Sequence, residues 1–199
     1  MSNGTQSQAP NRRIFLDYAH KITGLPAQTV GDFWQWAYSD VLSNRNRSIF
    51  AEYLVGVALE SVDRPRVEWD SVDLRYKDAK VEVKSAADGR ATNGDAAKVQ
   101  FSIRKSTSNE PAEEGDGDGG ESARFADVYV FCHYLERDAV KADILDVQAW
   151  DFYVVSTKAL NAKFGEAKSI ALASLQRLSK ACKFDALRAR VDTAVARAG

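Results

Sequence analysis

The chain has 199 residues, 45% hydrophobic and 28% charged, with a formal net charge of −1. This balance is typical of one soluble globular domain. Two cysteines without a CxxC spacing exclude a disulfide scaffold and a Cys-rich zinc site, and two histidines exclude a His-rich metal site. No apolar run is long enough to span a membrane, and the polar N-terminus lacks the apolar core of a signal peptide. We therefore expect a cytoplasmic protein with no membrane partner, in which carboxylates and lysines carry any chemistry.

The N-terminal third predicts a tail and two helices. Residues 1–13 are polar and are expected to form a disordered tail, ahead of a single domain over residues 14–199. Apolar residues recur at helical spacing over residues 29–42. Ser43 and Asn44 then provide a cap for a second helix over residues 45–60.

The remainder predicts a sheet followed by helices. Alternating apolar residues indicate strands over residues 66–76 and 80–85, joined by a turn at Lys77 and Asp78, and a further strand over 98–104. Residues 125–135 are apolar almost throughout, as in a central strand buried on both faces, and 150–155 form another strand. Helices are expected over 174–180 and 184–198. The fold class is α/β (α+β), with a central mixed sheet flanked by helices.

An acidic segment separates two of these strands. Residues 106–123 contain six acids and no base, so removing them changes the net charge of the chain from −1 to +5. The segment is also rich in glycine, and we expect a disordered loop. It is either a plain solvated linker or an acidic flap that competes with nucleic acid for a basic groove.

An isolated carboxylate marks the second helix. Glu52 is the only charged residue between Phe50 and Leu59, and Gly56 lies one turn later, where another part of the chain can approach closely. Glu52 either belongs to a narrow polar face or points inward toward a polar site. A buried acid must be paired, protonated or bound to a metal, so the second interpretation requires partners elsewhere.

The hairpin offers such partners. A turn at Lys77 and Asp78 places Asp73 directly across from Glu82, with Cβ atoms about 5 Å apart. Two carboxylates that close repel each other unless a cation lies between them or one is protonated. Their oxygens and a nearby main-chain carbonyl, that of Val83, would form half of a shell for Mg²⁺. Lys84 reaches the same face and can orient a water or neutralise developing negative charge.

The acid-x-Lys pattern is not specific alone. It also occurs at Asp78 to Lys80 and at Glu166 to Lys168, and such a strand face is commonly a solvated surface. Only Glu82 and Lys84 lie in a clean strand, face an acid across a hairpin and follow a helix with an isolated carboxylate.

Glu52 in a helix, Asp73, then Glu82-Val83-Lys84 and Ser85, in that order, resemble the PD-(D/E)XK nuclease superfamily, which has the restriction-endonuclease-like fold. The resemblance covers residues 44 to about 135. It implies metal-dependent cleavage of nucleic-acid phosphodiesters. Asp73 and Glu82 would bind Mg²⁺, Lys84 would position or activate the attacking water, and Glu52 would support the metal shell.

Two features depart from that family, and the assignment of two residues stays open. Val72 precedes the motif aspartate where the family has proline, and Asp70 rivals Asp73 if a bulge exchanges their faces. Gln100 is available as the polar residue that the family places on the next strand. No crossover helix is evident between residues 104 and 125, where only the acidic segment lies.

The interpretation is an Mg²⁺-dependent endonuclease, with Mn²⁺ as a substitute ion, acting on DNA and possible as a homodimer. Arg45, Arg47, Ser85, Arg90 and Gln100 are the candidate nucleic-acid contacts, although Arg45 and Arg47 are equally consistent with solvated charges. The alternatives are a catalytically inactive member of the fold that binds nucleic acid or protein through its basic end helix, and an unrelated α+β enzyme with a plain hairpin surface.

Overall fold

The computed structural model describes residues 14–68, 72–88, 98–106, 122–136 and 143–197. The expected tail, Asp70, Arg90 and residues 107–121 of the acidic segment lie outside them. Among the described residues, no helix combines the length and apolar character needed to cross a membrane.

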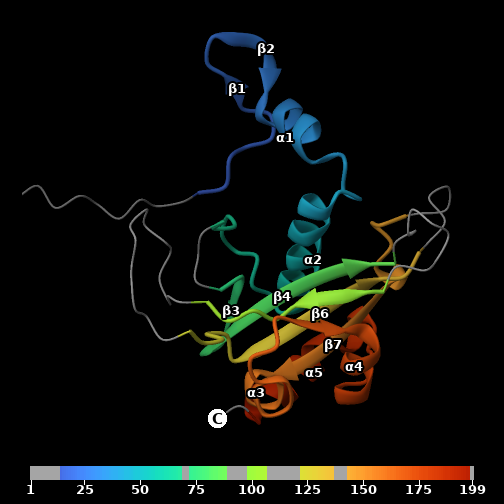
Figure 1. Cartoon of the computed structure of the whole chain (residues 1–199). Helices are drawn as coiled ribbons and strands as arrows, with labels where there is room; N and C mark the ends of the chain where they lie inside the picture. Colours follow the sequence, from blue (N-terminus) through green and yellow to red (C-terminus); the bar gives the residue numbers. More distant parts are fainter. Residues whose placement is uncertain (1–13, 69–71, 89–97, 107–121, 137–142, 198–199) are drawn as a thin grey trace, which may run out of the picture.

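A central mixed sheet organises the fold (Figure 1). Its strands lie in the order β3 (Leu74–Tyr76), β4 (Ala79–Ala87), β6 (Val128–Tyr134) and β7 (Trp150–Ser156). The β4–β6 pair is parallel, whereas β3–β4 and β6–β7 are antiparallel. Every residue of β6 is buried, which confirms the prediction of a central strand buried on both faces. The expected mixed sheet flanked by helices is therefore present.

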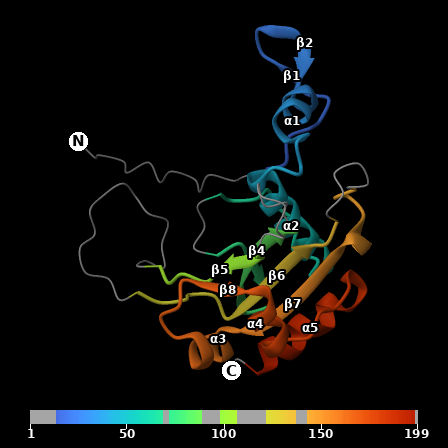
Figure 2. The same cartoon turned by 45° about the vertical axis from the view of Figure 1, so that its right-hand side comes forward.

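Helices cover both faces of this sheet (Figure 2). On one face, α2 (Asn44–Ala58) and α5 (Phe184–Ala196) pack on side chains such as Val81, Val83 and Val130. On the other face lie α3 (Thr157–Phe164), α4 (Leu172–Leu178) and a two-stranded ribbon of β5 (Gln100–Ser102) and β8 (Ser169–Ala171). The alternation of side chains along β4 therefore sends odd-numbered residues toward α2 and even-numbered residues toward the ribbon.

Two predicted strands are wrong in extent. Among the described residues, the strand expected over 66–76 is found only at Leu74–Tyr76, and residues 66–68 are not strand because Arg66 and Glu68 turn toward α2. The strand expected over 98–104 is confined to Gln100–Ser102 and pairs with β8 instead of extending the central sheet. The periodicity of a sequence indicates which side chains are buried, not how many residues pair with a neighbouring strand. Both segments contain buried side chains, although only three residues of each form a strand.

The connection between β4 and β6 contains no helix in its described residues, 88, 98–106 and 122–127, and residues 107–121 lie outside them. The ends of the acidic segment are tied together, since Ser106 and Ala123 exchange two main-chain hydrogen bonds of 2.9 Å. This corrects the expected boundaries of the loop: its first and last residues are paired.

The N-terminal part projects from the sheet beyond the start of α2 (Figures 1 and 2). It comprises β1 (Lys21–Ile22), β2 (Leu25–Thr29) and α1 (Val30–Tyr38). Thr29 and Asp32 form a reciprocal capping box at the start of α1, which explains where this helix begins. The two β-strands were not predicted, and neither were α3, β8 and the short 3₁₀ turn Val147–Ala149.

Candidate active site

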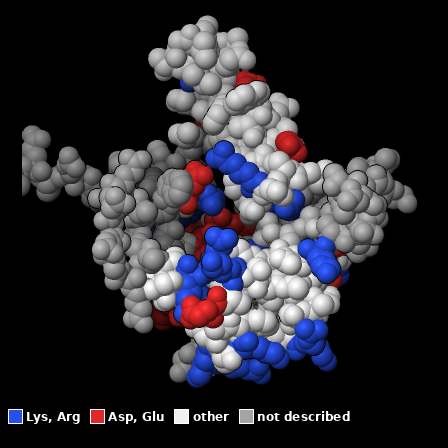
Figure 3. All heavy atoms as spheres, viewed as in Figure 1, with Lys and Arg blue, Asp and Glu red and all other residues white. Residues whose placement is uncertain are grey.

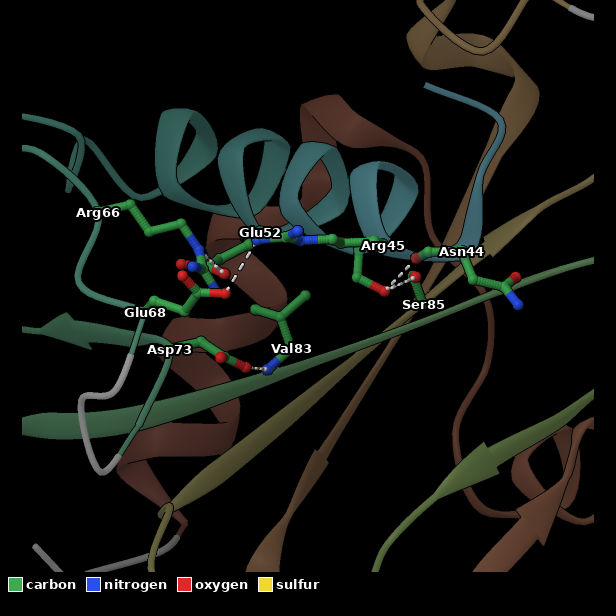
Figure 4. Close-up of polar contacts among 9 residues, drawn as sticks. Asn44, Arg45, Glu52, Arg66, Glu68, Asp73, Val83 and Ser85 are labelled. Carbon is green, nitrogen blue, oxygen red and sulfur yellow. Dashed lines mark hydrogen bonds and ion pairs between the residues drawn. The ribbon is translucent and has the colours of Figure 1, made fainter. Parts of the chain in front are cut away.

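β3 pairs only with the beginning of β4, so beyond Val81 this edge of β4 has no partner strand among the described residues. We call this place the opening in the sheet edge. The β3–β4 register pairs Leu74 with Val81, as the predicted turn required, but β3 begins at Leu74. Asp73 lies just beyond this end, and its Oδ2 accepts a hydrogen bond of 2.7 Å from the Val83 main-chain N–H (Figure 4). The N–H and C=O of one strand residue point to the same side, so the Val83 carbonyl also faces this edge. The shortness of β3 thus brings a carboxylate and a main-chain oxygen together.

Glu82 and Lys84 lie on the face of β4 that carries the β5–β8 ribbon. Their side chains form an ion pair and are 20% and 31% exposed, so solvent and a ligand can reach both. Tyr129 is the register partner of Glu82 on β6. Burial and the neighbouring Glu82 raise the pKa of Tyr129, so its hydroxyl remains protonated beside the acid.

Glu52 points inward from α2. Its side chain is only 9% exposed, and Oε2 accepts a hydrogen bond of 2.7 Å from Arg66 Nε (Figure 4). Gly56, one turn later, lets the following segment pack closely, because a Cβ atom there would lie 2.7 Å from Val62. The Ser61 N–H also bonds to the Gly56 carbonyl at 2.8 Å. This close packing returns the chain beside α2 and supplies Arg66, the partner that a buried acid needs.

The carboxylates interact electrostatically. Burial raises the pKa of Glu52 to about 7 despite the Arg66 hydrogen bond, and the negative charges of Asp73 and Glu82 add to the rise. Burial and Asp73 raise the pKa of Glu82, while Lys84 opposes this. Burial disfavours the charged form of Lys84, but Glu82 and Asp73 outweigh it, and the pKa of Lys84 is raised. The site therefore holds an excess of negative charge that one lysine and one arginine offset only in part.

The metal-free protein should lose stability as Glu52 ionises. In the unfolded chain the Glu52 carboxyl has a pKa near 4.5, so between that pH and about 7 only the folded state keeps the proton. The free energy of unfolding therefore falls as the pH rises through this range. In chelator, the free energy of unfolding of the parent should fall by about 2–3 kcal/mol between pH 5 and pH 8 relative to Glu52→Gln. Urea titrations across this range measure it, and parallel pH profiles for the two proteins would contradict it.

The donor set fits a hard divalent cation. Asp73 and Glu82 provide carboxylate oxygens and Val83 a carbonyl oxygen, the ligand types that Mg²⁺ prefers, with its remaining positions filled by water or substrate. A cation would also relieve the repulsion that raises the pKa of Glu82. No group of three or more His, Cys, Asp or Glu side chains suited to a metal occurs within the described ranges. The fit therefore depends on two carboxylates and one main-chain oxygen.

The structure brings some of the candidate nucleic-acid contacts near the site. Ser85 Oγ lies 3.0 Å from Ser48 Oγ, under α2, and Arg45 is exposed and forms an ion pair of 3.3 Å with Glu68 (Figure 4). The guanidinium of Arg47 donates to the Leu42 carbonyl and to Asn44 at the start of α2. The expected contact of Arg47 with nucleic acid stays a prediction.

Gln100 lies exposed on β5 and so outside the central sheet. Two further members of the site, Arg66 and Tyr129, were not predicted. The need of a buried Glu52 for a cation was visible in the sequence, but nothing identified Arg66 as that cation.

A cavity of about 430 Å³ adjoins the acids. Glu52 and Asp73 line it together with Arg66, and Tyr53 and Phe15 contribute aromatic side chains. In Figure 3, Asp and Glu side chains occupy the depth of a recess and Lys and Arg side chains gather around it. This face of the molecule therefore combines a recess that contains acids with surrounding positive charge that can hold an anionic ligand.

Comparison with models of known protein families finds none that matches this chain. Comparisons with curated proteins and with solved structures find no match either.

Proposed function

We propose that the protein is a metal-dependent phosphodiesterase of the PD-(D/E)XK kind that cleaves DNA. The observation that carries this proposal is the convergence of Glu52, Asp73, Glu82 and Lys84 at one opening in the sheet edge. These residues come from a helix, a strand end and a second strand, and each interacts electrostatically with others of the four. A plain surface hairpin would leave Glu52 apart from Glu82.

The proposed roles follow from the chemistry of each group. A bound Mg²⁺ would polarise the phosphate and lower the pKa of a coordinated water. Asp73, Glu82 and the Val83 carbonyl would hold the cation. Lys84 would orient the attacking water and neutralise negative charge that develops on the phosphate oxygens. Glu52, held by Arg66, would supply negative charge on the α2 side of the site and fix the position of α2.

Chain topology gives further support. The strand that carries Glu82 and Lys84 is antiparallel to the strand that follows Asp73 and parallel to the next strand of the sheet, β6. The helix with Glu52 packs on this same strand through Val81 and Val83. The order of a helix, an antiparallel strand pair and then a parallel strand agrees with the family resemblance. Two features differ from it: β5 pairs with β8 instead of adding a third antiparallel strand to the central sheet, and no crossover helix is found among the described residues between β4 and β6.

Calorimetry with Mg²⁺ and plasmid nicking test the proposal. The parent should bind Mg²⁺ and nick plasmid DNA, and Glu82→Gln should bind the ion at least about tenfold more weakly because one carboxylate ligand is lost. Glu166→Gln is the matched control: it removes an acid from the same acid-x-Lys pattern on the surface, where the Glu166 side chain is 83% exposed. A parent that neither binds Mg²⁺ nor nicks DNA would contradict the proposal.

A catalytically inactive binding module is the second candidate. The observation that favours it is the pairing of every acid in the cluster: Glu82 with Lys84, Glu52 with Arg66, and Asp73 with the Val83 N–H. Such a site is satisfied without a cation. DNA binding that is unchanged by Mg²⁺ and by Glu82→Gln, without nicking, would support this candidate.

A further inference from the structure

The β5–β8 ribbon presents one polar, basic face to solvent. Alternate residues at and around β5, Lys98, Gln100, Ser102 and Arg104, are exposed, whereas Phe101 and Ile103 between them are buried. On β8 the register partner of Ser102 is the exposed Ser169. The strand period of two therefore places two cations and three neutral hydrogen-bonding side chains on the outward face.

This ribbon lies beside the candidate active site. Its buried Phe101 packs edge-on against Phe131, with ring centroids 5.2 Å apart. Phe131 is the register partner of Lys84 on the central sheet. β5 thus lies against β4 on the sheet face from which Glu82 and Lys84 project, and the side chains of Glu82 and Lys84 remain 20% and 31% exposed there.

The charge of the outward face suits a polyanion. Lys98 and Arg104 form no ion pair with any described residue, and neither β5 nor β8 contains an acid. The nearby Glu166 is neutralised by Lys105. Among the described residues this face is therefore basic, although the whole chain carries a net charge of −1, and a basic face suits phosphates.

The face is also held rigidly. The buried guanidinium of Arg124 donates to the carbonyls of Ile103 and Ala167 at 2.8 and 3.0 Å, joining the two strands at one end of the ribbon. It also donates to Asn161 and to the Gly165 carbonyl on α3 and its cap. From Lys98 to Arg104 the ribbon spans about 20 Å, more than half a turn of B-DNA.

We infer that the outward face of the β5–β8 ribbon is a DNA-binding surface that lies along the duplex beside the cleavage site. Lys98 and Arg104 contact phosphates, and Gln100, Ser102 and Ser169 between them donate to the backbone or to base edges in the groove. The reason for a DNA-binding surface beside the cleavage site rests on the proposed function. DNA binding by these side chains, however, requires no metal.

Fluorescence anisotropy with a labelled DNA duplex in EDTA, over a range of KCl concentrations, tests the inference. Lys98→Ala with Arg104→Ala should weaken binding at least about tenfold at 0.1 M salt and reduce the slope of log K against log salt by about 1.8. Gln100→Ala should weaken binding without changing that slope, because it removes no charge. Arg190→Ala with Arg197→Ala is the matched control, since α5 packs on the opposite face of the sheet.

Parental affinity and slope in the Lys98/Arg104 variant would overturn the inference, as would equal losses in the α5 control. Binding of an RNA duplex of the same sequence as tightly as DNA would overturn the assignment to DNA.

The plasmid assay separates the two proposals. A parent that binds through the ribbon and does not nick contradicts the nuclease alone, whereas a fully active ribbon variant contradicts the ribbon alone.

Discussion

Replacing Lys84 with methionine should lower the rate of plasmid nicking at least about 10³-fold while leaving Mg²⁺ affinity within a few fold of the parent. Lys84 pairs with Glu82 and remains 31% exposed, so its ammonium can reach a bound phosphate or water. Methionine keeps an unbranched side chain only one atom shorter than that of lysine, and it removes the charge and the hydrogen-bond donors. The metal ligands Asp73, Glu82 and Val83 are retained, which separates catalysis from cation binding.

Two further variants sharpen this result. Lys84→Arg keeps the positive charge but replaces the compact ammonium with a planar guanidinium, and we expect partial activity. Lys168→Met changes the lysine of the surface acid-x-Lys pattern and should nick plasmid at the parental rate. Initial rates on supercoiled plasmid and calorimetry with Mg²⁺ provide both readouts. More than a tenth of the parental rate in Lys84→Met would contradict the role given to Lys84.

Local pattern predicted most elements of the central sheet. The turn at Lys77 and Asp78 fixed the β3–β4 register, since two-residue turns leave one pairing, and Leu74 is found opposite Val81. The continuous apolar run of β6 correctly indicated a strand buried on both faces. The β5–β8 ribbon was missed because β8 is only three residues long and its partner lies about 70 residues earlier in the chain. Pairings of that kind leave no local signal.

The acid cluster was predictable for a physical reason. Glu52 stands alone in an apolar helix, and a carboxylate there demands partners wherever the chain can supply them. The partner Arg66 was not predictable, because it reaches Glu52 through an irregular segment after Gly56 that periodicity cannot describe. Among the described residues of that segment, the expected strand forms only from Leu74 onward, and Asp73 just before it meets the Val83 N–H.

Replacing Arg124 with methionine should lower the free energy of unfolding by about 3–5 kcal/mol. The residue is 7% exposed, and its hydrogen bonds go to the carbonyls of Ile103, Gly165 and Ala167 and to the Asn161 amide. Methionine fills much of the volume but leaves these buried acceptors without donors. Each unsatisfied group costs about 1–3 kcal/mol, whereas the buried apolar stem is largely retained.

Urea unfolding followed by circular dichroism measures the loss, and Arg177→Met is its matched control. Arg177 is an arginine on α4 whose guanidinium donates to Ser174 within its own helix, at 2.9 Å, so we expect a change below about 0.5 kcal/mol. Because Arg124 joins β5 to β8, its replacement should also weaken DNA binding under conditions where the domain remains folded. An Arg124→Met protein as stable as the parent would show that water satisfies these carbonyls and that the ribbon needs no such clamp.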